Sequence, residues 1–260
     1  MQKNNTKYTI DNLLDIMKKL RDECPWDAKQ THQTLKQYLL EEAYEVLETI
    51  DAESWDELSS ELGDILLQVI FHSEIASRAN RFEFSDVVDK ISTKLINRHP
   101  HVFADKRVNS AEEVQQNWEH TKLINEKRQS ILEGIPKAAP ALLQAQRLQQ
   151  KAATVGFDWN DLNPVVDKVD EEWQEFKQAL KENNQSAVKS ELGDFFFSLV
   201  NLARFCHIVA EDALRQTNKK FIRRFQYIEK QYENNPKLLR EQTLDSLDHH
   251  WNEAKKMEND

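Results

Sequence analysis

The sequence contains few residues that break helices: only four glycines and six prolines occur among 260 residues. Its two cysteines, Cys24 and Cys206, are too few for a disulfide framework or a zinc-binding pattern. No apolar run approaches the ~20 residues that a membrane-spanning helix requires. Residues 1–5 lack the apolar stretch of a signal peptide. We therefore expect neither a secreted disulfide-rich domain nor a membrane protein, and we predict a cytoplasmic location.

Basic residues are outnumbered by acidic ones, 35 against 45, which gives a formal net charge of −10. A polyanion such as DNA is a poor partner for an acidic surface, so we expect no nucleic acid polymer to bind. Strict alternation of polar and apolar residues is missing, whereas apolar residues recur at helical spacing, most clearly in segments 58–79 and 188–210. With 39% hydrophobic and 31% charged residues, the sequence predicts a folded all-α protein.

An acidic pattern occurs twice, as Glu-Glu-x-x-Glu followed by Glu-Leu-Gly-Asp, and corresponding residues lie 130 positions apart. The two copies are Glu41, Glu42, Glu45 with Glu61–Asp64, and Glu171, Glu172, Glu175 with Glu191–Asp194. Two of the four glycines, Gly63 and Gly193, belong to this pattern. A glycine inside a helix costs about 1 kcal/mol relative to alanine, so its repetition indicates a packing or site requirement. We predict tandem repeats at 1–130 and 146–260, with a linker region at 131–145.

The spacing within the second copy predicts a metal site. Residues three apart share a helix face, so Glu172 projects with Glu175, and Glu191 projects with Asp194. The segment between the pairs is long enough for an antiparallel helical hairpin that brings them together. Four ionised carboxylates at close range repel one another unless a cation binds. Magnesium suits them, with manganese as a substitute, because it leaves coordination positions for substrate phosphates. We predict that these four residues bind the metal and form the catalytic centre.

Three other interpretations of the acidic residues fit less well. A solvated helix face would not require the spacing and the glycine to be retained in both copies. A di-iron carboxylate bundle needs Glu-x-x-His on two helices, and none of the eight histidines has a glutamate three positions before it. Zinc is disfavoured because histidine and cysteine are not clustered. We interpret four of the histidines as surface or capping residues: His99, His101, His249 and His250.

Basic residues near the second copy are candidates for binding a triphosphate. Lys168 precedes Glu172 by one helical turn, and Lys189 lies just before Glu191. Further along, the candidates are Lys220, Arg223 and Arg224, beside a predicted buried stripe of Phe221, Phe225 and Ile228. On a surface these cations would form plain ion pairs, which contribute little. Beside a metal-binding cluster, a phosphate-binding role is favoured.

The first copy keeps its acids, Glu42, Glu45, Glu61 and Asp64, but not all of these cations. Tyr38 stands where the second copy has Lys168, Ser59 stands where it has Lys189, and Asn97 stands where it has Arg223. We therefore predict that the C-terminal copy is the main catalytic centre. The N-terminal copy is left open as a structural, regulatory or weakly active site.

These features resemble the MazG family of nucleoside triphosphate pyrophosphohydrolases, within the all-α NTP pyrophosphatase superfamily. The resemblance covers nearly the whole chain. Besides both acidic copies it includes Cys24–Asp27 with Gln30–His32, Arg98–Phe103 and Val155–Trp159. It implies magnesium-dependent hydrolysis of NTPs and dNTPs to a nucleoside monophosphate and pyrophosphate, with little base selectivity, by a homodimer of intertwined helical hairpins. It also implies that Trp251 lies near the nucleotide together with Lys168, Lys189, Lys220, Arg223 and Arg224, and that Trp118 is its counterpart in the first copy.

Two other classes of function are weighed against hydrolysis. A nucleotide-sensing or partner-binding module with little turnover would explain why the first copy has lost cations. A purely structural helical dimer is disfavoured, because packing alone would not require the retained acids. The physiological substrate and the base preference are not predicted, because they depend on the shape of a pocket.

Overall fold

The computed structural model describes residues 7–104 and 129–258. Within these ranges every regular element is a helix and no strand occurs, which confirms the predicted all-α class. The chain forms two compact units, Met1–Val108 and Asn109–Asp260, and each carries one copy of the acidic pattern. The predicted linker region 131–145 contributes turns and the start of a helix to the second unit. Its role as a domain boundary stays a prediction, and Trp118 lies outside the described residues.

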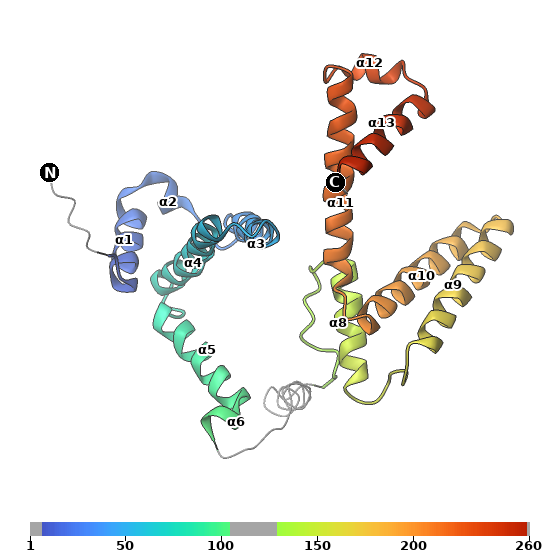
Figure 1. Ribbon diagram of the computed structural model, residues 1–260. Coiled ribbons are helices and arrows are strands. Elements are labelled where there is room, and N and C mark those ends of the chain that lie inside the picture. The colour runs from blue at the N-terminus through green and yellow to red at the C-terminus, as the bar shows by residue number, and fades with distance from the viewer. Residues whose placement is uncertain (1–6, 105–128, 259–260) are drawn as a thin grey trace. The chain divides into compact units, whose positions relative to one another are not determined.

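The described part of unit 1 is built around a helical hairpin. Its elements are α1 (Ile10–Glu23), α2 (Pro25–Lys29), α3 (Lys36–Asp51), α4 (Trp55–Arg78), α5 (Phe84–Arg98) and α6 (Pro100–Phe103). Helices α3 and α4 pack side by side after a short turn, and α1 packs on α4 (Figure 1). A core of Met17, Leu35, Ile70 and Phe71 fills the space between them. Each of these side chains is at most 3% exposed.

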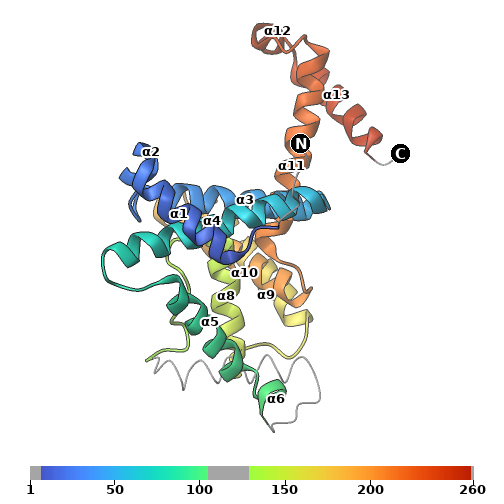
Figure 2. The ribbon, with the colours of Figure 1, turned by 90° about the vertical axis from the view of Figure 1, so that its left-hand side faces the viewer.

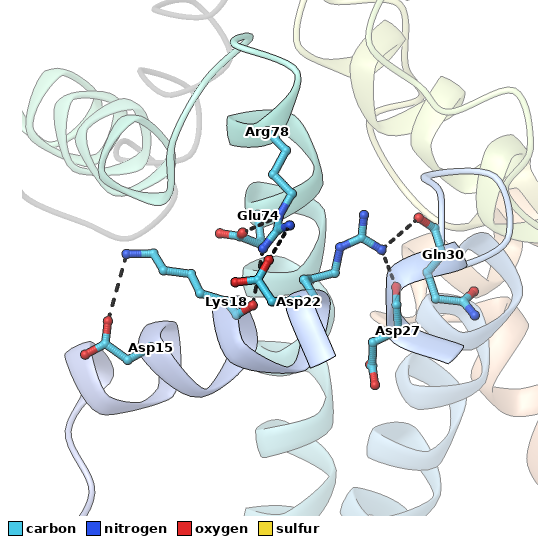
Figure 3. A network of polar contacts seen from close by, with 8 residues as sticks. Asp15, Lys18, Asp22, Asp27, Gln30, Glu74 and Arg78 are labelled. Carbon is cyan, nitrogen blue, oxygen red and sulfur yellow. Dashed lines mark hydrogen bonds and ion pairs between the residues drawn. The ribbon is translucent and has the colours of Figure 1, made fainter. Parts of the chain in front are cut away.

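Polar contacts at the surface also join α1 to α4 (Figure 3). Arg78 on α4 forms ion pairs with Asp22 at 2.8 Å and with Glu74 at 2.7 Å. Its Nη2 also donates to the backbone carbonyl of Lys18 at 3.2 Å. Such exposed pairs usually contribute less than about 1 kcal/mol. The apolar core is therefore the main source of stability for this contact.

The described part of unit 2 repeats the hairpin and adds a long arm. Its elements are α8 (Ala141–Ala153), α9 (Asn163–Lys181), α10 (Gln185–Phe205), α11 (Ala210–Gln231), α12 (Pro236–Arg240) and α13 (Leu244–Met257). Asn184 starts α10, because its side chain accepts hydrogen bonds from the backbone of Ser186 and Ala187. Helices α9 and α10 form the predicted hairpin, and α8 packs against α10. Figures 1 and 2 both show α11 leading away from this hairpin, with α13 folding back on α11.

The pattern of burial confirms that the two hairpins are repeats. Leu35 and Val165, which occupy equivalent positions 130 residues apart, are each 1% exposed. Ile70 and its counterpart Val200 are 0% and 2% exposed. Both hairpins therefore bury the same positions of the duplicated sequence.

Packing within the units accounts neither for the repeated glycines nor for the predicted burial of two phenylalanines. Gly63 and Gly193 are exposed, and a Cβ added at either would meet no atom within 4 Å, so packing inside a unit does not explain them. Phe221 and Phe225, predicted to be buried, are 56% and 40% exposed, whereas Ile228 is 3% exposed as predicted. The reason is that neighbouring helices cover only part of α11, so one of its apolar faces stays open.

No single helix in the described ranges is long and apolar enough to cross a membrane. Helices α10 and α11, bent by 102° where they meet, satisfy length and composition criteria only as a pair.

Candidate functional site

The hairpin of unit 2 gathers three of the four predicted acids into one cluster. Glu172 and Glu175 lie one turn apart on α9, and Glu191 lies on the facing helix α10. One carboxylate oxygen from each residue lies within 4.8 Å of the other two. We call these three residues the acidic cluster of unit 2. Their side chains range from buried, for Glu172, to exposed, for Glu175.

The fourth acid, Asp194, lies one turn after Glu191 on α10 and is exposed. It is not within the group of three, but its charge reaches the cluster. Partial removal from solvent, followed by repulsion from Glu175 and Asp194, raises the pKa of Glu191. This is the electrostatic conflict that the sequence predicted for closely spaced carboxylates.

The cluster suits a hard divalent cation. Glu172 is 6% exposed, and its buried Oε2 has no hydrogen-bond partner among the described residues. A buried carboxylate oxygen without a partner is costly, and a bound cation would satisfy it. All three donors are carboxylate oxygens, which magnesium and manganese accept. The binding of metal by Glu172, Glu175, Glu191 and Asp194 remains a prediction.

Lys168 forms an ion pair with one member of this cluster, Glu172. Its Nζ lies 2.8 Å from Glu172 and 2.8 Å from Glu171, which is the adjacent acid on α9. These hydrogen bonds raise the pKa of Lys168, so it stays protonated near neutral pH. Lys189, the other predicted cation of the hairpin, is exposed on α10.

The remaining predicted nucleotide contacts gather elsewhere in unit 2. Arg224 on α11 lies over the ring of Trp251 on α13, with 5.3 Å from Cζ to the ring centroid. Arg223 and Arg224 both pair with Glu258, at 2.6 Å in each case. Lys220, one turn earlier on α11, is exposed. We call Arg223, Arg224 and Trp251 the basic cluster.

A single chain does not bring the acidic and basic clusters together. Among the described residues, those that line a cavity of about 300 Å³ at the basic cluster belong to α11 and α13, together with Glu258, which follows α13. In Figures 1 and 2, this part of α11 points away from the α9–α10 hairpin. The sequence predicted the residue types but not this separation, because helical spacing does not fix the direction of a whole helix.

A larger cavity, of about 470 Å³, opens beside the acidic cluster. One end is lined by Lys168, Glu172 and Asp194. The remaining wall is mostly apolar and comes from α8, α9, α10, the 157–159 segment and Leu132. We call it the hairpin cavity. Two buried carboxamides that line it, Gln149 and Asn201, were not predicted, because isolated amides on helices leave no recognisable sequence pattern.

Unit 1 contains the equivalent acidic cluster. Oxygens of Glu42, Glu45 and Glu61 also lie within 4.8 Å of one another. Burial, followed by repulsion from Asp64 and Glu45, raises the pKa of Glu42. Tyr38, at the position of Lys168, packs against the apolar core of unit 1 and does not supply a cation. Both units therefore contain an acidic cluster, but only unit 2 has a lysine, Lys168, at the position next to it.

None of the histidines in the described ranges belongs to either acidic cluster. His99 Nδ1 lies 2.7 Å from the backbone carbonyl of Leu95, and His250 Nδ1 lies 2.8 Å from Glu253. The sequence did not predict that His32 and His72 stack in unit 1, with their Nδ1 atoms 2.8 Å apart. Burial, and secondarily the charge of His32, lowers the pKa of His72.

Comparison with known proteins identifies relatives over almost the whole chain. Residues 30–103 and 163–228 match the family described as MazG nucleotide pyrophosphohydrolase domain, with one segment in each unit. A nucleoside triphosphate pyrophosphohydrolase of Escherichia coli (strain K12) is 43% identical, over 96% of this chain and 98% of its own. The nucleoside triphosphate pyrophosphohydrolase/pyrophosphatase MazG of Thermotoga maritima is 42% identical, over 95% of each chain.

A crystal structure of a MazG-related protein from Thermotoga maritima aligns with 44% of this chain and 98% of its own, at 27% identity and a TM-score of 0.39.

Proposed function

Since the chain belongs to the MazG nucleotide pyrophosphohydrolase family, we propose that it hydrolyses nucleoside triphosphates, both NTPs and dNTPs, to a nucleoside monophosphate and pyrophosphate. The observation that carries the proposal is the acidic cluster of unit 2, which has an unpaired buried oxygen on Glu172 and borders a cavity. A cytoplasmic location, where these substrates are abundant, remains part of the proposal.

In the proposed mechanism, Glu172, Glu175, Glu191 and Asp194 would hold Mg²⁺, with Mn²⁺ as a substitute. The ion would supply Lewis acidity toward the phosphates and toward a water molecule. Glu172 or Glu175 accepts a proton from the water that attacks the α-phosphorus, and the α–β anhydride bond breaks to release pyrophosphate. Lys168 keeps Glu172 in position through their 2.8 Å contact and adds positive charge at the cavity.

In this proposal Arg223 and Arg224 of the basic cluster bind the nucleotide's phosphates, and Trp251 of the same cluster lies beside the nucleotide. Because these residues lie apart from the acidic cluster of their own chain, we propose a homodimer in which α11 and α13 of one protomer serve the acidic cluster of the other. Exposed apolar side chains support this assignment. Phe221 on α11 is 56% exposed, and Phe196 on the outer face of α10 is 51% exposed. A partner protomer would cover both faces.

Product analysis tests the reaction. Incubation with ATP and Mg²⁺ is expected to release AMP and pyrophosphate in equal amounts, and a chelator is expected to stop the release. Release of ADP and inorganic phosphate would refute the proposal. Tight magnesium-dependent binding of nucleotide without any product would instead identify a nucleotide-sensing module.

Matched substitutions test which of the two acidic clusters catalyses the reaction. Glu172→Ala is expected to lower kcat/KM by about 100-fold or more, because it removes a group that contacts the metal. Glu42→Ala, the same change in the first copy, is expected to change it less than about threefold. Circular dichroism must report a helical protein in both cases. Equal losses from the two substitutions would mean that the first copy also contributes to turnover.

A further inference from the structure

The hairpin cavity has the size and composition of a site for a small organic group. Its volume of about 470 Å³ lies within the usual range of small-molecule pockets, about 300–1,000 Å³. Apolar walls come from Ala152, Trp159, Val165 and Phe197. Such pockets typically combine apolar walls with a few fixed polar groups that orient the ligand.

Gln149 supplies one such fixed polar group. It lies on α8 and is 8% exposed. Its Nε2 donates to the backbone carbonyl of Phe197 at 2.8 Å, which fixes the orientation of the amide, since a carbonyl oxygen accepts only. The other end, Oε1, is buried without a hydrogen-bond partner. Gln149 therefore offers an acceptor that nothing in the described part of the chain satisfies.

Asn201 supplies the complementary group. It lies one turn after Phe197 on α10 and is 5% exposed. Its Oδ1 accepts hydrogen bonds from Arg204, from Nε at 2.9 Å and from Nη2 at 2.8 Å. The amide orientation is again fixed, and no hydrogen bond joins its Nδ2 to any described residue. Asn201 therefore offers a donor.

Arg204 is itself held in place by the segment that covers the cavity. Its guanidinium pairs with both carboxylate oxygens of Asp158, at 2.9 and 2.5 Å. Asp158 lies next to Trp159, and both residues line the cavity. A chain of hydrogen bonds therefore runs from Asp158 through Arg204 to Asn201. It holds the Asn201 side chain in a fixed position relative to the 157–159 segment that lines the cavity.

We propose that the hairpin cavity binds the base of the nucleotide, and that Gln149 Oε1 and Asn201 Nδ2 bind a donor and an acceptor on one edge of that base. This inference rests on the proposed function, because it assumes that the triphosphate lies at the end of the cavity lined by Glu172 and Asp194. Adenine and cytosine each present an exocyclic amino donor beside a ring-nitrogen acceptor on this edge. Because both amides are fixed, the pair matches these two bases and selects against purine rings that lack the amino donor.

Unit 1 lacks the amide of Asn201 and the cation of Lys168 at the equivalent positions. Phe71 stands at the position of Asn201 and belongs to the apolar core of unit 1. Tyr38, at the position of Lys168, packs against the same core. Glu74 stands at the position of Arg204. Unit 1 therefore keeps an acidic cluster but fills with apolar side chains the positions that hold Lys168 and Asn201 in unit 2.

The test compares ATP with purine riboside 5′-triphosphate, which lacks only the exocyclic amino donor. The wild-type protein is expected to prefer ATP by about tenfold in kcat/KM, because the analogue leaves Gln149 Oε1 unpaired. Gln149→Met keeps the length of the side chain but removes the acceptor, and it is expected to reduce the preference to about one. Gln150→Met is the matched control. Gln150 is the next residue on α8 and bonds Arg147 at 2.8 Å, so the preference is expected to stay at about tenfold.

Each outcome separates the two proposals. If the wild type cleaves both triphosphates equally well, the base-binding inference is overturned and the proposed reaction stands. An equal fall for both substrates in Gln149→Met, which leaves the tenfold preference intact, would assign Gln149 a structural role and also overturn the inference. If the wild type converts neither substrate to a monophosphate and pyrophosphate, the proposed function itself fails.

Discussion

Glu258 and Arg224 form a close ion pair, in which Oε2 of the glutamate accepts hydrogen bonds from Nε and Nη2 of the arginine, at 3.0 and 2.6 Å. Arg223 bonds the other oxygen of the same carboxylate at 2.8 Å. The two guanidinium groups lower the pKa of Glu258 from 4.5 to about 2. The carboxylate of Glu258 is therefore ionised at any physiological pH. It accepts hydrogen bonds from the same two arginines that are proposed to bind phosphate.

The first prediction concerns the pH dependence of this pair. A folded-state pKa below the unfolded value means that the pair stabilises the protein above pH 4.5 and loses this effect as the pH falls toward 2. Glu258→Gln cannot lose a charge in this window. The difference in melting temperature between wild type and variant is therefore expected to be largest above pH 5 and to shrink toward pH 2. A difference that stays constant across this range would show that the ion pair does not form in solution.

The second prediction concerns metal binding in the absence of substrate. A cation that binds only the folded protein raises its stability, by about 2.7 kcal/mol at a concentration 100 times its Kd. We expect Mg²⁺ to raise the melting temperature of the wild type, and Glu191→Gln to reduce that rise. The matched variant Glu61→Gln reports the cluster of unit 1 in the same assay. If neither variant alters the rise, the ion binds outside both acidic clusters.

The third prediction concerns the proposed sharing of sites between protomers. Glu172→Ala and Arg224→Ala are each expected to be inactive alone. In a refolded mixture about half of the dimers contain one chain of each kind. Such a dimer has one intact site if the clusters act across the interface, so about a quarter of the wild-type activity is expected. Mixed dimers that are detected by native mass spectrometry but remain inactive would mean that the two clusters act within one chain.

The fourth prediction concerns the repeated glycine. A Cβ added at Gly193 meets no atom within 4 Å. Gly193→Ala is therefore expected to raise the free energy of unfolding of the protein by about 1 kcal/mol. We nevertheless expect Gly193→Ala to lower kcat/KM by about tenfold, because the glycine lies between Glu191 and Asp194, where the proposed site would place the substrate. Gly63→Ala is the control in the first copy. Higher stability with unchanged turnover would remove any role for the glycine in the site.

The fifth prediction concerns the core of unit 1. Phe71 is 3% exposed, and Phe71→Ala is expected to lower the free energy of unfolding by about 3–5 kcal/mol. Val88→Ala, at a side chain that is 44% exposed, is expected to change it by about 0.5 kcal/mol or less. Chemical denaturation followed by circular dichroism gives both values. A small loss at Phe71 would contradict the assignment of this residue to the core.

The acidic cluster could be predicted from the sequence because its geometry is local. Glu172 and Glu175 share a face by helical spacing alone, and Asn184 marks the turn that brings α10 back along α9. The repeat at 130 residues also predicted a second hairpin, and the matching burial of Leu35 and Val165 agrees with it. These features depend on contacts between residues that are near one another in the chain.

The amino-acid sequence alone thus determined the helical class, the duplication and the meeting of carboxylates across each hairpin, since spacing along a helix fixes which side chains share a face. Only the tertiary structure decided that Gln149 and Asn201 line one cavity, that Arg224 bonds Glu258 away from the acids, and that Phe221 stays uncovered. The physical reason is that these relationships depend on the directions in which α8 and α11 leave the hairpin, and those directions result from packing between helices.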